Sequence, residues 1–251
     1  MELEMSTKLK HQLEKTQEDL ALLKAEYEEF VYIVSHDLSA PLRQVEGFVE
    51  IITEKHADSF DDKTKRHFEL INSGTFKAKQ ILDAITRYSR INTVIEPYTL
   101  LDLNVVIDDL KNNLSSLINK NNALFTFDTL PKIQGSREQI TKVFECLIHN
   151  ALTYQQDGNQ PVIKLSVSDK GDVWQFCIND NGIGVADNNT DKIFKVLRRG
   201  VSDKKYAGMG MGLSISKKII QKHHGDIWLD AGLECGASFY FTIAKDLQND
   251  Q

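Results

Sequence analysis

The sequence predicts an α+β protein in which a long helical hairpin precedes a two-layer α/β domain. Apolar residues from Leu9 to Val34 recur at spacings of four and three, which is the period of a packed helix. Beyond Pro97, short runs of strand character alternate with helical patterns, which is typical of a sheet covered by helices. We therefore expect a coiled-coil helix at 1–29, a helical hairpin at 30–95, a hinge at 96–104 and the α/β domain at 105–251.

The composition excludes several classes of protein. The chain has 251 residues, of which 41% are apolar and 26% charged, as in ordinary globular proteins. Its net charge of −6 argues against a nucleic-acid partner. No apolar run is long enough to span a membrane and no cleavable signal is present. The three cysteines are far apart and show no metal-binding spacing, so we expect reduced thiols in a cytoplasmic protein.

The apolar seam that begins at Leu9 favours a coiled coil, because Glu and Lys fill the positions beside it. A single solvated helix is the alternative interpretation. The seam continues from Val34 to Ile52 with one additional spacing of four. Such a stutter locally unwinds a supercoil, and it falls beside His36.

His36 lies two residues from both Val34 and Leu38, which places it about 200° round the helix from either one. We therefore expect its side chain to point away from the seam into solvent. A neutral imidazole there can serve as a nucleophile or as a metal ligand. Pro41 removes the backbone donor to the carbonyl of Asp37, so a kink is expected just after the histidine.

A second amphipathic helix is predicted after a turn at 54–62, with apolar residues at helical spacing from Phe68 to Tyr88. Two such helices joined by a short turn form a hairpin that cannot cover both of its apolar faces alone. Pairing two hairpins into a four-helix bundle covers them, so we expect a homodimer.

The second domain alternates helices and strands. A helix capped by Asn104 is expected first, and a later helix begins at Ser136 with Gln139 in the capping-box position. A turn at 170–172 joins two strands as a hairpin. The expected strands lie at 98–103, 123–128, 162–168, 173–179, 227–230 and 237–243, and a last helix lies at 212–223.

Two polar stretches of this domain could bind a ligand. Cys146, Asn150 and Thr153 share one stripe of a helix expected to reach Gln156, and an Asn carbonyl can bind Mg²⁺ that bridges nucleotide phosphates. A surface amide is the alternative interpretation. Asp180 to Gly184 follows a strand, where two glycines permit close backbone approach and the acid can accept from an amine such as that of adenine. An ordinary turn is the alternative there.

A third stretch has glycines at 208, 210 and 212 and opens a helix. Such an entry offers free backbone N–H groups and the positive end of the helix dipole to phosphate oxygens. It has neither the Walker pattern nor the dinucleotide fingerprint. We interpret the preceding basic segment, Arg198 to Tyr206, as a mobile lid, with a flexible surface loop as the alternative.

In this order and at these separations, the stretches resemble the catalytic core of the sensor histidine kinases of two-component signalling. The phospho-acceptor segment of the phytochrome-associated kinases often reads S-H-D-L-x-x-P-L-R, and Ser35 to Arg43 matches it. The helix of Asn150 resembles the N box of the family. Asp180 to Gly184, Ile193-Phe194 and Gly208 to Gly212 resemble its first glycine box, F box and second glycine box.

The resemblance implies a dimerisation and histidine phosphotransfer hairpin followed by a GHKL-type ATP-binding domain. It implies autophosphorylation of His36 from ATP with Mg²⁺, assisted by Asp37, and transfer to an aspartate of a response-regulator receiver domain. Asn150 would be the metal ligand. The implied nucleotide-binding residues are Asn150, Tyr154, Asp180, Gly182, Gly184, Gly208, Gly210, Gly212 and Leu213. Since the heptads start abruptly, we also expect an upstream sensor domain in a longer protein.

Three positions depart from the family pattern. Cys146 stands where the N box usually begins with Asn, and Thr153 stands where a Lys is common, although Tyr154 keeps the usual aromatic. Ala40 replaces a Thr or Asn that would position water, so we expect weak phosphatase activity. Two other functions stay open, a non-catalytic dimeric signalling scaffold with a degenerate nucleotide-binding domain and an ATP hydrolase.

Overall fold

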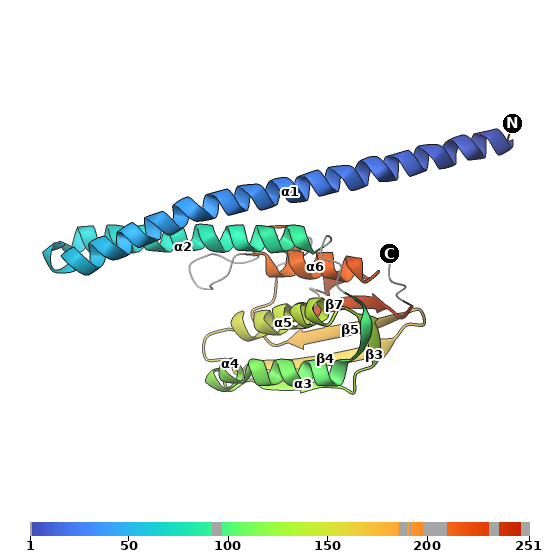
Figure 1. The fold of residues 1–251 in the computed structure, drawn as a ribbon. Coiled ribbons are helices and arrows are strands. Elements are labelled where there is room, and N and C mark those ends of the chain that lie inside the picture. Colours follow the sequence, from blue (N-terminus) through green and yellow to red (C-terminus); the bar gives the residue numbers. More distant parts are fainter. Residues whose placement is uncertain are drawn as a thin grey trace. The chain divides into compact units, whose positions relative to one another are not determined.

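The computed structural model describes residues 2–91, 97–185, 190, 192–197, 210–230 and 236–246, with the side chains of 2–8 and 57 left out. The chain divides into two compact units, 1–94 and 95–251, and each is described by itself. Figure 1 shows the elements of both units.

The first unit is a helical hairpin. Helix α1 (Glu2–His56) and helix α2 (Asp62–Arg90) are joined by the short 3-10 helix η1 (Ala57–Ser59), as Figure 1 shows. Asp61 caps α2, because its carboxylate accepts from the Thr64 N–H at 2.7 Å. Helix α1 continues through Pro41, so the expected kink does not interrupt it.

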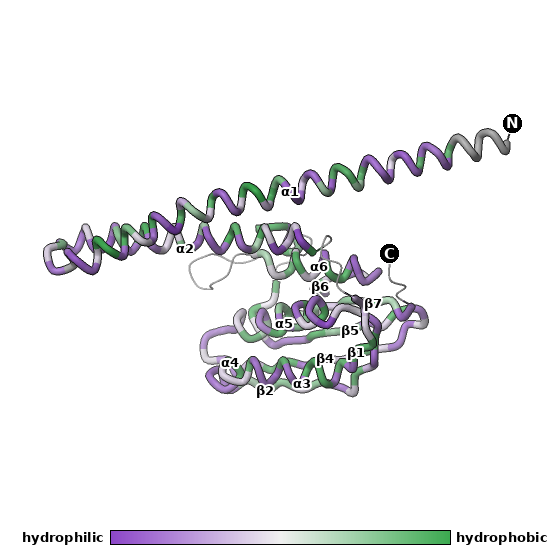
Figure 2. The backbone as a smooth tube through the Cα atoms, in the orientation of Figure 1, coloured by the Kyte–Doolittle hydropathy of each residue, from purple (hydrophilic) through white to green (hydrophobic). Residues whose placement is uncertain are grey.

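The two helices contact each other along one stripe of α1. Val31, Ser35 and Val49 are buried on this stripe, and Lys79 of α2 forms an ion pair with Glu46 at 3.2 Å. Val49 also belongs to the predicted seam, but 48% of Leu38 and 41% of Val45, two other seam residues, remain exposed. Figure 2 shows hydrophobic segments recurring along α1 between hydrophilic ones. The hairpin therefore leaves apolar surface uncovered, as predicted.

The second unit contains a mixed sheet. Among the described residues it has five strands in the order β2-β4-β5-β7-β6, of which β2 and β4 are parallel and the other neighbours antiparallel. A separate pair of strands, β1 (Thr99–Asp102) and β3 (Lys132–Gly135), is antiparallel. The strands of the main sheet are β2 (Leu124–Phe127), β4 (Val162–Asp169), β5 (Val173–Asp180), β6 (Ile227–Asp230) and β7 (Ala237–Ala244).

Helices cover one face of this sheet. Helix α5 packs on β4 and β5, helix α6 packs on β6 and β7, and α3 packs against α5 (Figure 1). The rings of Phe144, Phe176 and Phe241 meet in the core at centroid distances of 5.0–5.8 Å. On the other face, Lys164 and Trp228 are exposed, so the predicted two-layer architecture is confirmed. The helices are α3 (Leu103–Asn113), α4 (Ser115–Lys120), α5 (Arg137–Thr153) and α6 (Gly212–Lys222), with a 3-10 helix η3 (Lys192–Phe194).

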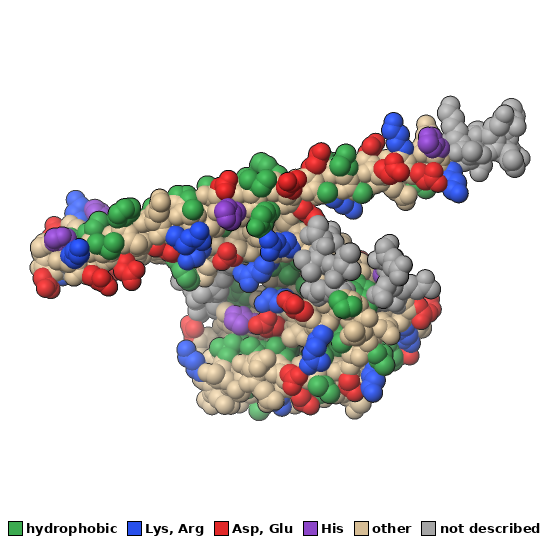
Figure 3. All heavy atoms as spheres, in the orientation of Figure 1, with side chains coloured by type: hydrophobic (Ala, Val, Ile, Leu, Met, Phe, Trp, Pro, Cys, Tyr) green, Lys and Arg blue, Asp and Glu red, His purple; other side chains and the backbone are tan. Residues whose placement is uncertain are grey.

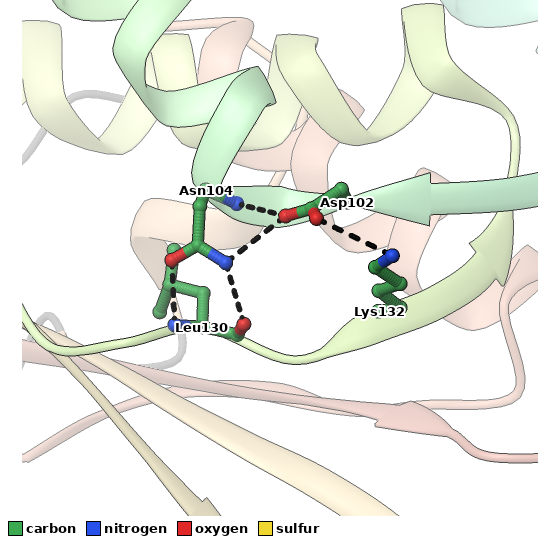
Figure 4. Close-up of polar contacts among 4 residues, drawn as sticks. All are labelled: Asp102, Asn104, Leu130 and Lys132. Carbon is green, nitrogen blue, oxygen red and sulfur yellow. Dashed lines mark hydrogen bonds and ion pairs between the residues drawn. The ribbon is translucent and has the colours of Figure 1, made fainter.

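The predicted cap of α3 was wrong. Asp102 is the N-cap residue, and its carboxylate accepts from the Asn104 N–H at 3.1 Å. The side chain of Asn104 is used elsewhere, because its Oδ1 accepts from Leu130 N at 2.9 Å and its Nδ2 donates to Leu130 O at 2.8 Å (Figure 4). Lys132 of β3 lies 3.7 Å from Asp102. These contacts fasten α3 to β1 and β3. Strand β3 and helix α4 were not predicted.

Two boundaries near the candidate site also differ from the prediction. Helix α5 ends at Thr153 instead of reaching Gln156, because the backbone leaves the helical region at Tyr154 (φ −88°, ψ 64°). Asp180 is the last residue of β5 and pairs with Ala237, whereas the sequence suggested that it follows the strand. The helices of the described part of the chain are all too short or too polar to cross a membrane.

Candidate functional site

His36 projects from α1 with 69% of its side chain exposed, as the seam spacing predicted. Its Nδ1 lies 3.2 Å from Oδ1 of Asp37. Because an ionised carboxylate can only accept, this contact assigns the proton to Nδ1 and leaves a lone pair on Nε2. The imidazole is therefore arranged as a nucleophile whose reactive nitrogen faces away from Asp37.

An aromatic ring and a cation lie next to this histidine. The ring of Tyr32, one turn earlier on α1, is 6.3 Å from the imidazole. The guanidinium of Arg90, at the end of α2, lies 4.8 Å over the Tyr32 ring, a distance at which cation–π attraction acts. These contacts tie the end of α2 to the turn that precedes His36.

In the second unit, the last turns of α5 carry the predicted polar stripe. Asn150 Nδ2 donates to the sulfur of Cys146 at 3.8 Å, so its carbonyl oxygen can accept from or bind another group. Burial raises the pKa of the Cys146 thiol to about 11. The thiol is therefore neutral at pH 7 and is a poor metal ligand. Thr153 pairs instead with His149, its Oγ1 lying 3.3 Å from Nδ1.

The segment after β5 approaches the end of α5 closely. The Ile183 N–H donates to the carbonyl of Tyr154 at 3.0 Å. A Cβ added to Gly182 would lie 2.2 Å from the same carbonyl oxygen, and Gly184 has a φ of +69°. Only glycine fits both positions. The two glycines thus let this segment pass against the α5 terminus.

Asp180 lies at the base of this segment and is 7% exposed. Its Oδ1 accepts from the Gly182 N–H at 2.8 Å. Burial raises the pKa of its carboxyl to about 6, while the N–H groups of Gly182 and Ala237 oppose that rise. A buried acceptor of this kind can bind the amino group of a ligand.

Helix α6 begins at Gly212 without a side-chain cap from Met211, so its first N–H groups can donate hydrogen bonds to an anion. A Cβ at Gly212 would lie 2.6 Å from the sulfur of Cys146, which places this terminus directly against α5. Gly210 has a φ of +69°, and Leu213 is half-buried. Gly208 and the expected lid, Arg198 to Tyr206, lie outside the described residues.

The structure therefore brings the end of α5, the Asp180 segment and the start of α6 together. His36 and Asp37 lie in the other unit, and the arrangement of the two units is not described. Ile193 and Phe194 of η3 are buried, with Phe194 packed against Phe239. Sequence reasoning missed Asn159, whose side chain bonds to the Asp180 segment at Asn181. Nothing in a lone Asn within a turn signals that contact.

Comparisons with known proteins place this geometry in a family. Residues 135–247 match the family described as histidine kinase-, DNA gyrase B- and HSP90-like ATPase. Over 225 residues, or 90% of the chain, the sequence is 33% identical to cyanobacterial phytochrome A of Nostoc sp.. The chain contains the catalytic core of a sensor histidine kinase. This histidine kinase core spans 29% of the length of that phytochrome.

Solved structures agree with this assignment. The catalytic domain of the histidine kinase ThkA is 27% identical, with a TM-score of 0.51 over 59% of this chain and 95% of that one. Full-length ShkA, solved in complex with AMPPNP, has a TM-score of 0.64 over 88% of this chain and 47% of that one. Because the two sequences are only 17% identical, this likeness shows a shared fold and nothing about activity. The fold of this histidine kinase core, a helical region followed by an ATP-binding α/β domain, is thereby established.

Proposed function

We propose that His36 accepts the γ-phosphoryl group of ATP and then passes it to an aspartate of a response-regulator receiver domain. The observation that carries the proposal is the exposed imidazole whose Nδ1 is held by Asp37 at 3.2 Å. It occurs in a chain whose second unit has the fold of a histidine kinase-like ATPase.

The chemistry requires one bond to form and one to break. The lone pair of His36 Nε2 attacks phosphorus, while the bond from phosphorus to the bridging oxygen breaks and its electron pair leaves with ADP. The imidazole becomes positively charged as the N–P bond forms. The carboxylate of Asp37 stabilises that charge and can take the Nδ1 proton.

The second unit would hold the nucleotide. Asp180 would accept from the amino group of adenine, and the uncapped N-terminus of α6 would face the phosphates. Gly182, Gly184, Gly210 and Gly212 would allow the backbone to approach the nucleotide, and Tyr154 and Leu213 would line the same region. Gly208 is proposed from the sequence alone.

The residues fit a magnesium ion held jointly with phosphates. Among the described residues, no group of three His, Cys, Asp or Glu side chains could hold a metal ion. A single amide oxygen, that of Asn150, is left free to bind because the amide nitrogen is turned to Cys146. Mg²⁺ is usually bound by one or two protein oxygens together with substrate phosphates. When bound, it would neutralise charge on those phosphates.

A second copy of the chain would cover the exposed seam of the hairpin. Leu38, Val45 and Ile52 are 38–48% exposed although they repeat at packed-helix spacing. Figure 3 shows hydrophobic side chains along the surface of the first unit. A four-helix bundle buries such seams and leaves His36 outside for the receiver.

An upstream sensor domain is proposed because the chain spans 29% of its phytochrome relative.

Incubation with γ-labelled ATP and Mg²⁺ tests the proposal. We expect the protein to carry a label that is stable in alkali and lost in acid. The His36→Gln variant should carry no label. Asp37→Asn should slow labelling about 100-fold, as general catalysts commonly contribute that much. Release of labelled phosphate without protein labelling would instead identify an ATP hydrolase.

A signalling scaffold is the second candidate function. It is favoured by the neutral thiol of Cys146 and by the pairing of Thr153 with His149, since neither side chain offers a charge to the phosphates. Absence of any label across a range of Mg²⁺ concentrations, with the dimer intact, would support the scaffold and contradict the kinase.

A further inference from the structure

The side-chain amide of Asn159 joins two segments of the second unit. Asn159 is half-buried in the turn between α5 and β4. Its Nδ2 donates to Asn181 O at 2.9 Å and to Gln155 Oε1 at 2.8 Å, and its backbone N–H donates to Gln156 O at 3.1 Å. Because both amide protons have acceptors, the orientation of the amide is fixed.

The Asn181 carbonyl that Asn159 holds belongs to the same peptide as the N–H that contacts Asp180. The oxygen of Asn181 and the N–H of Gly182 are parts of one planar peptide. That N–H donates to Asp180 Oδ1 at 2.8 Å. Holding the oxygen therefore also sets the direction of the N–H. Asn159 thus acts on Asp180 through a single rigid group.

The groups on both sides of this peptide are hydrogen-bonded as well. Oδ1 of Asn181 accepts from Val162 N at 2.8 Å, and its Nδ2 donates to Gln160 O at 2.9 Å. On the far side, the Ile183 N–H donates to Tyr154 O at 3.0 Å. The end of α5, the start of β4 and the Asp180 segment are thereby held in register.

We propose that Asn159 is a positioning residue for nucleotide binding. By holding the Asn181–Gly182 peptide, it keeps the Gly182 N–H on Asp180 and orients the carboxylate toward the exocyclic amine of a purine nucleotide. The inference rests on the proposed function for the identity of that ligand. The hydrogen bonds themselves exist without the nucleotide, so the positioning of Asp180 can be measured separately.

The charge state of Asp180 provides that measurement. Burial raises the pKa of its carboxyl to about 6, and the N–H groups of Gly182 and Ala237 both act in the opposite direction. A Gly182 N–H that drifts away from the carboxylate would let the pKa rise further. The titration of Asp180 therefore reports whether Asn159 holds the peptide.

The test uses Asn159→Ala in the full chain. We expect the ¹³C NMR titration midpoint of the Asp180 carboxyl, in nucleotide-free protein, to move up by about half a pH unit, as loss of part of one hydrogen bond predicts. The KM for ATP in autophosphorylation should rise about threefold to tenfold with a smaller change in kcat, because Asn159 is proposed to act on nucleotide binding.

Gln160→Ala is the matched control. Gln160 offers only its backbone carbonyl to Asn181, while its side chain donates to Asn122 O at 2.7 Å, so the midpoint and the KM should not change. Gln155→Ala removes one acceptor of the Asn159 amide and should give a smaller shift in the same direction, which keeps the test valid if Asn159→Ala does not fold.

An Asp180 midpoint that stays at the wild-type pH in both Asn159→Ala and Gln155→Ala would overturn the inference. A shifted midpoint in a protein that binds no ATP would instead support the positioning of Asp180 and contradict the proposed function. A higher KM with an unshifted midpoint would count against the inference, because the effect would not pass through Asp180.

Discussion

Asp180 is held under two opposing demands. A buried carboxylate is costly because it loses hydration, and this cost appears as a pKa raised to about 6. In the proposed nucleotide site, the same burial would give the nucleotide a strong acceptor that is shielded from water. Stability and binding would then conflict at this residue, as is common at functional sites.

Replacing Asp180 by Asn should separate the two demands. Since the folded pKa is raised above its ordinary value of 3.8, the folded state binds more protons between about pH 4 and 6, and stability falls as the pH rises through that window. Asp180→Asn removes this loss and should be more stable than wild type above pH 7, by up to about 3 kcal/mol. Below about pH 4 the two proteins should be similar.

Denaturant unfolding across pH 4–8 measures that difference, and nucleotide binding should be lost in the same variant. Gln160→Ala is a suitable control, because it leaves the hydrogen bonds of Asp180 in place. Parallel pH dependence of the wild-type and Asp180→Asn proteins would contradict the assigned role of burial.

Ala40 occupies a position near His36 where a polar side chain could hold a water molecule. It lies one turn after His36 and is exposed, but its methyl group cannot hold a water molecule. We expect the protein to dephosphorylate its receiver slowly and Ala40→Thr to increase that rate about tenfold, a modest effect for a residue that positions water. The assay follows loss of labelled phosphate from the receiver with His36→Gln as background. A fast wild-type reaction that Ala40→Thr does not change would refute it.

At the scale of elements, α3 is secured by contacts that the side chain of its own Asn104 makes with residues outside the helix. Asn104 makes three side-chain hydrogen bonds, two to the backbone of Leu130 and one to Asp102 at 2.9 Å (Figure 4). Leu130 is 4% exposed, so its backbone groups would lose partners without gaining full hydration.

Asn104→Ala should therefore lower the free energy of unfolding by about 2–4 kcal/mol, as expected for buried backbone groups left without partners. Asn113→Ala, an exposed asparagine at the end of the same helix, should change it by less than about 0.5 kcal/mol. Urea denaturation compares the two variants. Equal effects would show that the contacts to Leu130 contribute nothing.

The same elements show what sequence could predict. Periodic apolar patterns located the strands at 162–168 and 227–230 to within one residue of β4 and β6. Lys132 to Gly135 lacks such a pattern, and β3 exists because it pairs with β1. The cap was misassigned to Asn104 because its role depends on Leu130, 26 residues away. Contacts distant in sequence leave no local signal, and Asn159 was missed for the same reason.

At the scale of the whole molecule, α1 runs unbroken from Glu2 to His56 and carries both the seam and His36. A continuous helix transmits rotation, since each residue turns it by about 100°. If two chains pair along the seam as proposed, the phase of the heptads sets which face of α1 meets the partner.

Deleting Lys24 alone should therefore change autophosphorylation several-fold by shifting the seam about 100°, whereas deleting residues 18–24 keeps the heptad phase and should largely preserve activity. Sedimentation of both variants checks that they remain dimers. If activity were the same in both, the seam would serve packing only.

In the proposed reaction, Nε2 of His36 accepts the phosphoryl group because Asp37 occupies Nδ1. A proton–phosphorus correlation NMR spectrum of the protein, recorded after incubation with ATP and Mg²⁺, identifies the phosphorylated nitrogen. We predict phosphorus coupled to both ring protons of His36, the pattern of Nε2 phosphorylation. Coupling to the Hε1 proton alone, which indicates Nδ1 phosphorylation, or absence of any phosphohistidine, would contradict phosphoryl transfer to Nε2.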